Sequence, residues 1–143
     1  MKALLLVTVF TLSFSAIAAC PNLSGIYQAC ESTSGMDMFQ LKELRLSQKN
    51  NIFTILNVNV SEAIDKSVIH ADGIARSQRM NRGPNSYTKN IKAECVGEAL
   101  IVHYKAFGFN EIHTYSKNES GSMVWNVTFD GNQYSATTCK SLN

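Results

Sequence analysis

Residues 123–130, Met-Val-Trp-Asn-Val-Thr-Phe-Asp, alternate between apolar and polar side chains, and this feature constrains the fold most. Such alternation is typical of a strand that buries one face. The apolar face holds Met123, Trp125, Val127 and Phe129. Asp130-Gly131-Asn132 then supplies a tight-turn signal, and residues 133–139 follow as a hairpin partner. A two-residue loop would place on the Trp125 face the side chains of Tyr134, Ala136 and Thr138.

Seven further segments have the length and texture of strands, and turn signals separate them. They are residues 24–31, 36–46, 52–60, 68–77, 86–94, 99–105 and 111–117. Short strands at this spacing predict an all-β fold, an antiparallel up-and-down barrel of about 8 strands, with a β-sandwich as the alternative. The nine candidates are an odd number, whereas such a barrel closes with an even one. We expect the error between residues 61 and 85, where Gly73, Gly83 and Pro84 interrupt the pattern.

Residues 36–46 are ambiguous between helix and strand. Strong helix formers fill them, and Ser34 is available as an N-cap. As a strand, the segment would place Phe39 and Leu41 on one face and Leu44 and Leu46 on the other, which requires a bulge. We favour the strand because the surrounding segments are all β.

The N-terminus has the three parts of a secretory signal. Lys2 supplies a positive charge, residues 3–14 are mostly apolar, and small residues stand at Ala16, Ala18 and Ala19. The apolar run is shorter than the roughly 20 residues that a membrane-spanning helix needs. We therefore expect residues 1–19 to be cleaved and residues 20–143 to form one exported domain, secreted or periplasmic.

Cysteine usage leaves two roles open for the first residue of that domain. The four cysteines, Cys20, Cys30, Cys95 and Cys139, suffice for two disulfides in an oxidising compartment. Residues 17–20, Ile-Ala-Ala-Cys, also resemble a bacterial lipobox, in which Cys20 would be lipidated and would tether the protein to a membrane. Four cysteines allow three pairings. An extended strand after Cys20 disfavours its pairing with Cys30 and favours Cys95 or Cys139 as the partner.

The start of the domain resembles a known barrel family. Residues 23–27, Leu-Ser-Gly-Ile-Tyr, are similar to the first strand of lipocalin-like, calycin-type β-barrels, with Tyr27 in place of the tryptophan of their Gly-x-Trp pattern. The resemblance implies a barrel that binds a small apolar ligand. Lipocalins pack that tryptophan against a basic residue from near the last strand. The corresponding pair here is Tyr27 with Lys140.

A second resemblance covers most of residues 20–143. Small exported bacterial proteins carry Cys-Pro-x-Leu-x-Gly-x-Tyr at the mature N-terminus, and residues 20–27 have this pattern. They also carry a Tyr-x(n)-Cys strand, matched by Tyr87 to Cys95, and a Cys-Lys or Cys-Arg pair near the C-terminus, matched by Cys139-Lys140.

Motifs for catalysis, metal or cofactors do not stand out in the chain. It has no Gly-rich phosphate loop, nucleophile elbow or His-Glu-x-x-His motif, so we expect no enzyme and no cofactor. His103 and His113 would face each other in one strand register and lie on opposite faces in the next, and no third ligand accompanies them. We expect no metal site. The formal charge of +2 gives no electrostatic support for nucleic-acid binding.

Two functions remain. The first is binding of a small apolar ligand in a cavity lined by Tyr27, Tyr104, Met123, Trp125, Val127, Phe129 and Tyr134; the same residues would otherwise be plain core. The second is a filled barrel that binds another protein through its loops. The surfaces for it would be residues 32–35, residues 118–122 and the basic stretch from Arg76 to Lys92.

Overall fold

The computed structural model describes residues 19–33, 41–82 and 85–142. They form ten strands: β1 (Gly25–Ser32), β2 (Leu41–Lys49), β3 (Ile52–Asn59), β4 (Ile64–His70), β5 (Arg76–Arg82), β6 (Asn85–Val96), β7 (Ala99–Ala106), β8 (Phe109–Lys117), β9 (Met123–Phe129) and β10 (Asn132–Ser141). The predicted signal peptide lies outside the described residues, except for Ala19. Within the described ranges, no helix is long and apolar enough to span a membrane.

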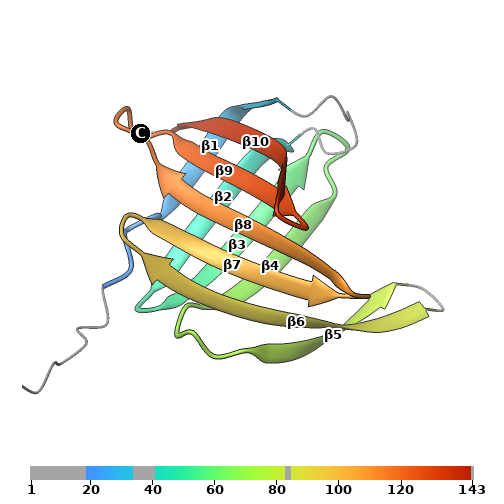
Figure 1. Cartoon of the computed structure of the whole chain (residues 1–143). Coiled ribbons are helices and arrows are strands. Elements are labelled where there is room, and N and C mark those ends of the chain that lie inside the picture. Colours follow the sequence, from blue (N-terminus) through green and yellow to red (C-terminus); the bar gives the residue numbers. More distant parts are fainter. Residues whose placement is uncertain (1–18, 34–40, 83–84, 143) are drawn as a thin grey trace, which may run out of the picture.

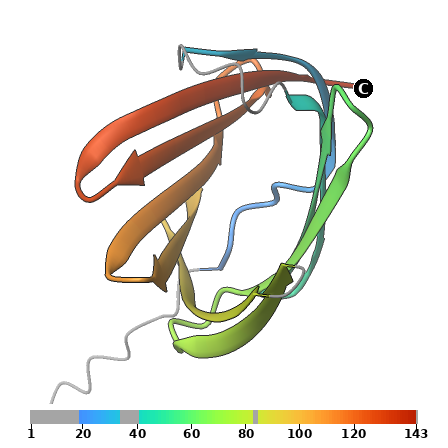
Figure 2. The same cartoon turned by 90° about the vertical axis from the view of Figure 1, so that its right-hand side faces the viewer.

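All ten strands belong to one antiparallel sheet in the order β4-β3-β2-β1-β10-β9-β8-β7-β6-β5 (Figure 1). The predicted all-β, up-and-down barrel is confirmed, and because there is one continuous sheet the sandwich alternative is wrong. The sheet curls so that β1–β4 face β8–β10 (Figure 2). Strands β4 and β5 are its two edges and do not pair with each other. The segment that connects β4 to β5 is bonded to β6, because the Gly73 N–H donates to the Ala93 carbonyl at 2.8 Å.

The strand count is ten rather than about eight, and the discrepancy lies where the sequence pattern is interrupted. The predicted strand over residues 68–77 is in fact the end of β4 and the start of β5. Asp72 separates them, because its carboxylate accepts hydrogen bonds from the Ile74 N–H (3.0 Å) and from the Arg76 guanidinium (2.5 and 2.7 Å). These contacts fix a local turn that ends one strand before the next begins.

Strand β2 confirms the β interpretation of the ambiguous segment as far as it is described. Residues 36–40 lie outside the described residues, and Leu41–Lys49 is a strand. Its register against β3 shifts between Leu41 and Glu43, which is the bulge that the apolar pattern required. Leu44 and Leu46 are buried inside the barrel.

The hairpin of β9 and β10 has the predicted turn at Asp130-Gly131, but its face assignment is wrong. The register shifts between Gln133 and Ser135, so one extra residue stands in β10. Beyond this bulge Thr137 lies opposite Trp125, and Cys139 lies opposite Met123. The inward face of β10 is therefore Ser135, Thr137 and Cys139 rather than Ala136 and Thr138.

One end of the barrel, which carries the turns at residues 50–51 and 97–98, is packed with side chains; we call it the filled end. Its core includes the fully buried residues Leu23, Tyr27, Leu44, Phe53, Ile55, Ile69, Leu100, Val102, Tyr115, Met123 and Cys139. Tyr27 is anchored there because its hydroxyl donates to the Leu23 carbonyl at 2.8 Å. The cation over its ring is Lys117, with Nζ 5.9 Å from the ring centroid. Lys140, the expected partner, is exposed on the outer face.

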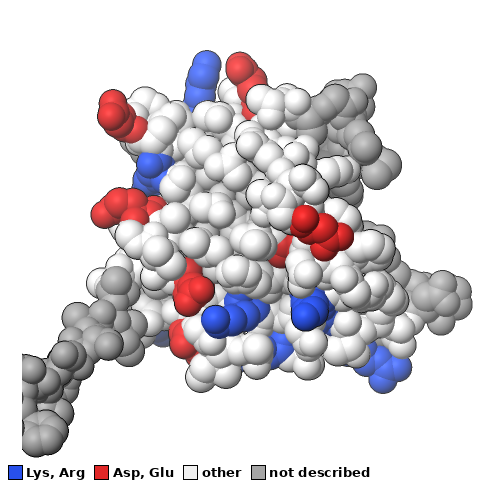
Figure 3. Space-filling view, viewed as in Figure 1, with Lys and Arg blue, Asp and Glu red and all other residues white. Residues whose placement is uncertain are grey.

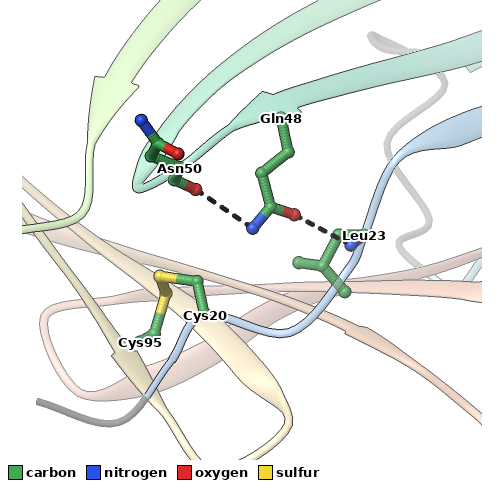
Figure 4. Close-up of a disulfide and its surroundings, with 5 residues drawn as sticks. All are labelled: Cys20, Leu23, Gln48, Asn50 and Cys95. Atoms are coloured by element: carbon green, nitrogen blue, oxygen red, sulfur yellow. Dashed lines mark hydrogen bonds between the residues drawn. A yellow bond between two sulfur atoms is a disulfide. The ribbon is translucent and has the colours of Figure 1, made fainter.

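Two disulfides brace the barrel. Cys20 is bonded to Cys95, which ties the segment before β1 to β6, and Cys30 is bonded to Cys139, which links β1 to β10. The segment that follows Cys20 crosses the filled end (Figure 4). It is held there by Gln48, whose Oε1 accepts from the Leu23 N–H at 3.3 Å while its Nε2 donates to the Asn50 carbonyl at 3.2 Å.

The outer face seen in Figure 3 carries its charges unevenly. Lys and Arg side chains gather over the part of the face where β5–β7 lie, and a largely uncharged area covers the middle of it. Most of the basic stretch from Arg76 to Lys92 lies in β5 and β6, which pair antiparallel at the edge of the sheet.

Candidate functional site

The other end of the barrel, which carries the turns at residues 107–108 and 130–131, is hollow; we call it the open end. It contains a cavity of about 500 Å³, within the range usual for small-molecule sites. Residues from seven strands line it: Ser32, Asn57, Asp65, Lys89, Glu111, His113, Trp125, Val127, Phe129, Tyr134, Ser135 and Thr137. The barrel thus combines a solid base with a space in which a ligand fits.

Trp125, Val127 and Phe129 form the apolar part of the cavity wall along β9. The Trp125 ring stacks on Tyr115 with centroids 5.6 Å apart and planes 11° apart. At the rim, the Phe129 ring packs against Phe109 at 5.3 Å. Because Tyr115 belongs to the filled end, Trp125 stands on the floor of the cavity with one face supported by the core.

His113 is the centre of a polar network beside this wall. The Trp125 indole N–H donates to Nδ1 of His113 at 3.2 Å, and the Tyr115 hydroxyl lies 3.3 Å from the same nitrogen. Since an indole only donates, Nδ1 is an acceptor and the ring proton is on Nε2. Nε2 then donates to Glu111 Oε1 at 2.5 Å. The network therefore fixes the tautomer of His113 and the direction of the Glu111 carboxylate.

Glu111 stays ionised in this setting. The hydrogen bond from His113 lowers the pKa of Glu111 most, burial opposes this effect, and the charge of Lys89 lowers the pKa further. Lys89 projects from β6, with its Nζ 3.8 Å from the centroid of the Tyr104 ring on the neighbouring β7. Burial first, and then the negative charges of Glu111 and Asp65, raise the pKa of the Tyr104 hydroxyl, so it stays protonated.

Asn57 and Asp65 form the polar part of the opposite wall. They are register partners on β3 and β4, so their side chains emerge side by side on the inner face. The Oδ1 atom of Asn57 is buried and has no hydrogen-bond donor among the described residues. A buried acceptor without a donor is costly and is found where a ligand or water completes the bond.

The seven residues predicted to line a cavity are split between the two ends of the barrel. Trp125, Val127, Phe129 and Tyr134 line the cavity at the open end. Tyr27 and Met123 lie in the packed core of the filled end. Tyr104 lies between the two groups, with its ring under Lys89 and in edge contact with His113 at 4.8 Å.

Sequence reasoning missed the polar half of the cavity, namely Asn57, Asp65, Lys89, Glu111 and His113. A signal for part of it was present: Glu111 and His113 alternate with Tyr115 in residues 111–117, which places them on the face of a buried aromatic residue. For Asn57 and Asp65 no such signal exists, because their neighbourhood depends on the register of β3 against β4.

His103 and His113 do not form a pair. Their strands are in register so that His103 lies opposite Ile112 and His113 opposite Val102, which puts the two imidazoles on opposite faces of the sheet. Within the part of the chain that the structure describes, no cluster of three or more His, Cys, Asp or Glu side chains is arranged to hold a metal ion.

Comparison with solved structures identifies the architecture. A structure of the REP1-NXSQ fatty acid transporter has a TM-score of 0.63 at 11% identity, covering 85% of this chain and 96% of that one. The wild-type fluorescent protein UnaG has a TM-score of 0.53 at 14% identity, covering 70% of this chain and 72% of that one. The chain shares the antiparallel β-barrel fold of these two proteins. No family model and no curated protein sequence matches the chain, so the likeness concerns the fold alone.

Proposed function

We propose that this calycin-type barrel is a binding protein that holds a small amphipathic ligand in the cavity at its open end. The observation that carries the proposal is the hollow half of the barrel, about 500 Å³, with an aromatic wall on β9 and a polar wall on β3 and β4. An apolar body would lie against Trp125, Val127 and Phe129. A polar end would lie between Asn57 and Glu111.

The fold comparison supports this class of function. The structural neighbours are a fatty acid transporter and a fluorescent protein, neither of which is named as an enzyme. We infer a binding role rather than a catalytic one. The alternative function, a filled barrel that binds a protein through its loops, lacks a supporting observation, because the open end is not filled by the described side chains.

We further propose that the domain is exported and that Cys20 acts as a disulfide partner, not as a lipid tether. The sulfur that lipidation would use is bonded to Cys95. The intact mass of the exported protein tests this: a mass for residues 20–143 less four hydrogens supports two disulfides, and added acyl mass contradicts the proposal.

Fluorescence of Trp125 tests ligand binding directly. Trp125 is the only tryptophan of the chain and lines the cavity, so its emission reports on this site alone. We expect a saturable change when amphipathic ligands with chains of eight to twelve carbons are added, and no saturable change with any of them contradicts the proposal.

A matched pair of variants locates the ligand. Thr137→Phe fills the cavity from β10, whereas Thr138→Phe places the same ring on the outer, exposed face of the same strand. We expect Thr137→Phe to weaken ligand binding by roughly tenfold or more, because the phenyl ring would occupy part of the cavity that the ligand fills. Thr138→Phe should leave ligand binding unchanged. Equal effects of the two variants would place the ligand elsewhere.

A further inference from the structure

The charged residues of the cavity have an excess of carboxylates. Of the described residues that line it, Asp65 and Glu111 are acidic, Lys89 is the one Lys or Arg, and no arginine is present. Lys89 is already balanced, because its charge acts on Glu111 and its ammonium lies on the Tyr104 ring. His113 donates to Glu111 through Nε2. The described lining therefore holds two carboxylates against one lysine.

The hydrogen-bonding capacity of the same wall is also biased toward acceptors. Asn57 Oδ1 is buried without a donor, and the Asp65 carboxylate emerges beside it from the paired strand. The negative charge of Asp65 reaches across the cavity, since it raises the pKa of the Tyr104 and Tyr115 hydroxyls on the facing strands. A ligand that donates hydrogen bonds and carries a positive charge would satisfy both groups together.

We propose that the cavity selects ligands with a protonated amine on an apolar body, received by Asn57 and Asp65, and discriminates against carboxylates. This inference rests on the proposed ligand-binding function. An alkylammonium group has three donors and no acceptor, which matches Oδ1 of Asn57 and the Asp65 carboxylate. A carboxylate in the same place would face like charge from Asp65 and would leave Oδ1 without a donor.

Three ligands with the same ten-carbon chain test ligand binding and amine selectivity separately: decylamine, decanol and decanoate. They are titrated at pH 7 against Trp125 emission, below the concentrations at which they aggregate, with calorimetry as a second readout. We expect decylamine to bind about tenfold tighter than decanoate, the factor that one charge-assisted hydrogen bond supplies, with decanol between them. Added salt should reduce the difference in affinity between decylamine and decanoate, because it screens the charge of Asp65.

Variants of the polar wall assign the preference to named groups. Asp65→Asn and Asn57→Leu should each reduce the ratio of decylamine to decanoate affinity, while decanol affinity changes little. Glu119→Gln is the matched control, because Glu119 is an exposed acid in the turn between β8 and β9 at the filled end. It should leave the ratio unchanged.

The outcomes test the amine selectivity and the proposed ligand-binding function separately. Decanoate binding as tightly as decylamine overturns the amine selectivity while the binding function stands. An unchanged ratio in both Asp65→Asn and Asn57→Leu overturns the assignment of the selectivity to this wall. If none of the three ligands binds, the binding function fails and the selectivity fails with it.

Discussion

The indole N–H of Trp125 on β9 donates to Nδ1 of His113 on β8, 3.2 Å away. This bond couples the cavity's aromatic wall to its polar network, because the opposite nitrogen of the same imidazole holds Glu111. A change at His113 is therefore expected to alter both the environment of the tryptophan and the stability of the barrel.

The His113→Leu variant should lower the free energy of unfolding by about 1–3 kcal/mol, since it removes the partners of the Trp125 N–H and of the Glu111 carboxylate. His113→Gln should recover part of this loss, because an amide can accept from one and donate to the other. Urea denaturation measures the free energy of unfolding of both variants, and the emission of Trp125 should shift more in the leucine variant. Equal losses in the two variants would show that only packing matters.

Gly25 is required because of its contact with Tyr27. A Cβ at position 25 would lie 2.9 Å from the Tyr27 hydroxyl oxygen, whose bond to the Leu23 carbonyl holds that ring in the filled end. We expect Gly25→Ala to destabilise the fold by about 1–3 kcal/mol, the cost usual for overpacking. Thermal or urea unfolding measures it.

A double-mutant cycle isolates this contact. Tyr27→Phe removes the hydroxyl, so Gly25→Ala should cost less in the Tyr27→Phe background than in the wild type. An alanine cost that is the same in both backgrounds would mean that the hydroxyl does not demand the glycine, and that the ring carbons 3.0 and 3.2 Å from the same Cβ or the backbone conformation do.

Each disulfide closes a long stretch of chain, 75 residues for Cys20 to Cys95 and 109 for Cys30 to Cys139. Replacing either pair by alanines should cost about 2–5 kcal/mol, because the unfolded chain regains its freedom. The two losses should be similar, since the loop term grows only slowly with length.

Amide exchange separates the local roles of the two disulfides. The Leu23 N–H, held by Gln48, should lose protection when Cys20 and Cys95 are replaced, and should keep most of it when Cys30 and Cys139 are replaced. Equal loss in both variants would contradict a separate anchoring role for the Cys20–Cys95 bond.

Acid should weaken the barrel partly through Glu111. Its pKa is lowered in the folded state from 4.5, chiefly by the His113 hydrogen bond, so it contributes stability above the unfolded value that is lost as pH falls through the folded pKa. As the pH falls below the unfolded value of 4.5, wild type should therefore lose more stability than Glu111→Gln. Unfolding curves across this range test it, and parallel losses would contradict it.

Local sequence patterns were sufficient to predict the strands whose faces differ in polarity. Residues 123–129 form β9 as expected, because alternation over seven residues specifies which side is buried. The count was wrong over residues 68–77, where the turn depends on the Asp72–Arg76 contact rather than on apolar pattern. Ala136 and Thr138 were assigned to the wrong face because the bulge between Gln133 and Ser135 changes the facing of the residues beyond it, and no local pattern marks its position.

The sequence alone determined that this chain is an antiparallel β protein with a Gly25-x-Tyr27 first strand, because alternation and turn residues act over a few positions. Only the tertiary structure decided that one end of the barrel holds a cavity, that Cys20 joins Cys95, and that Asn57, Asp65 and Glu111 line the same cavity. Those facts depend on strand register and on the curvature of the whole sheet, which bring together residues far apart in the sequence, 75 positions in the case of Cys20 and Cys95. Strand register and sheet curvature are set by the packing of side chains from different strands against each other, which the sequence of one segment does not specify.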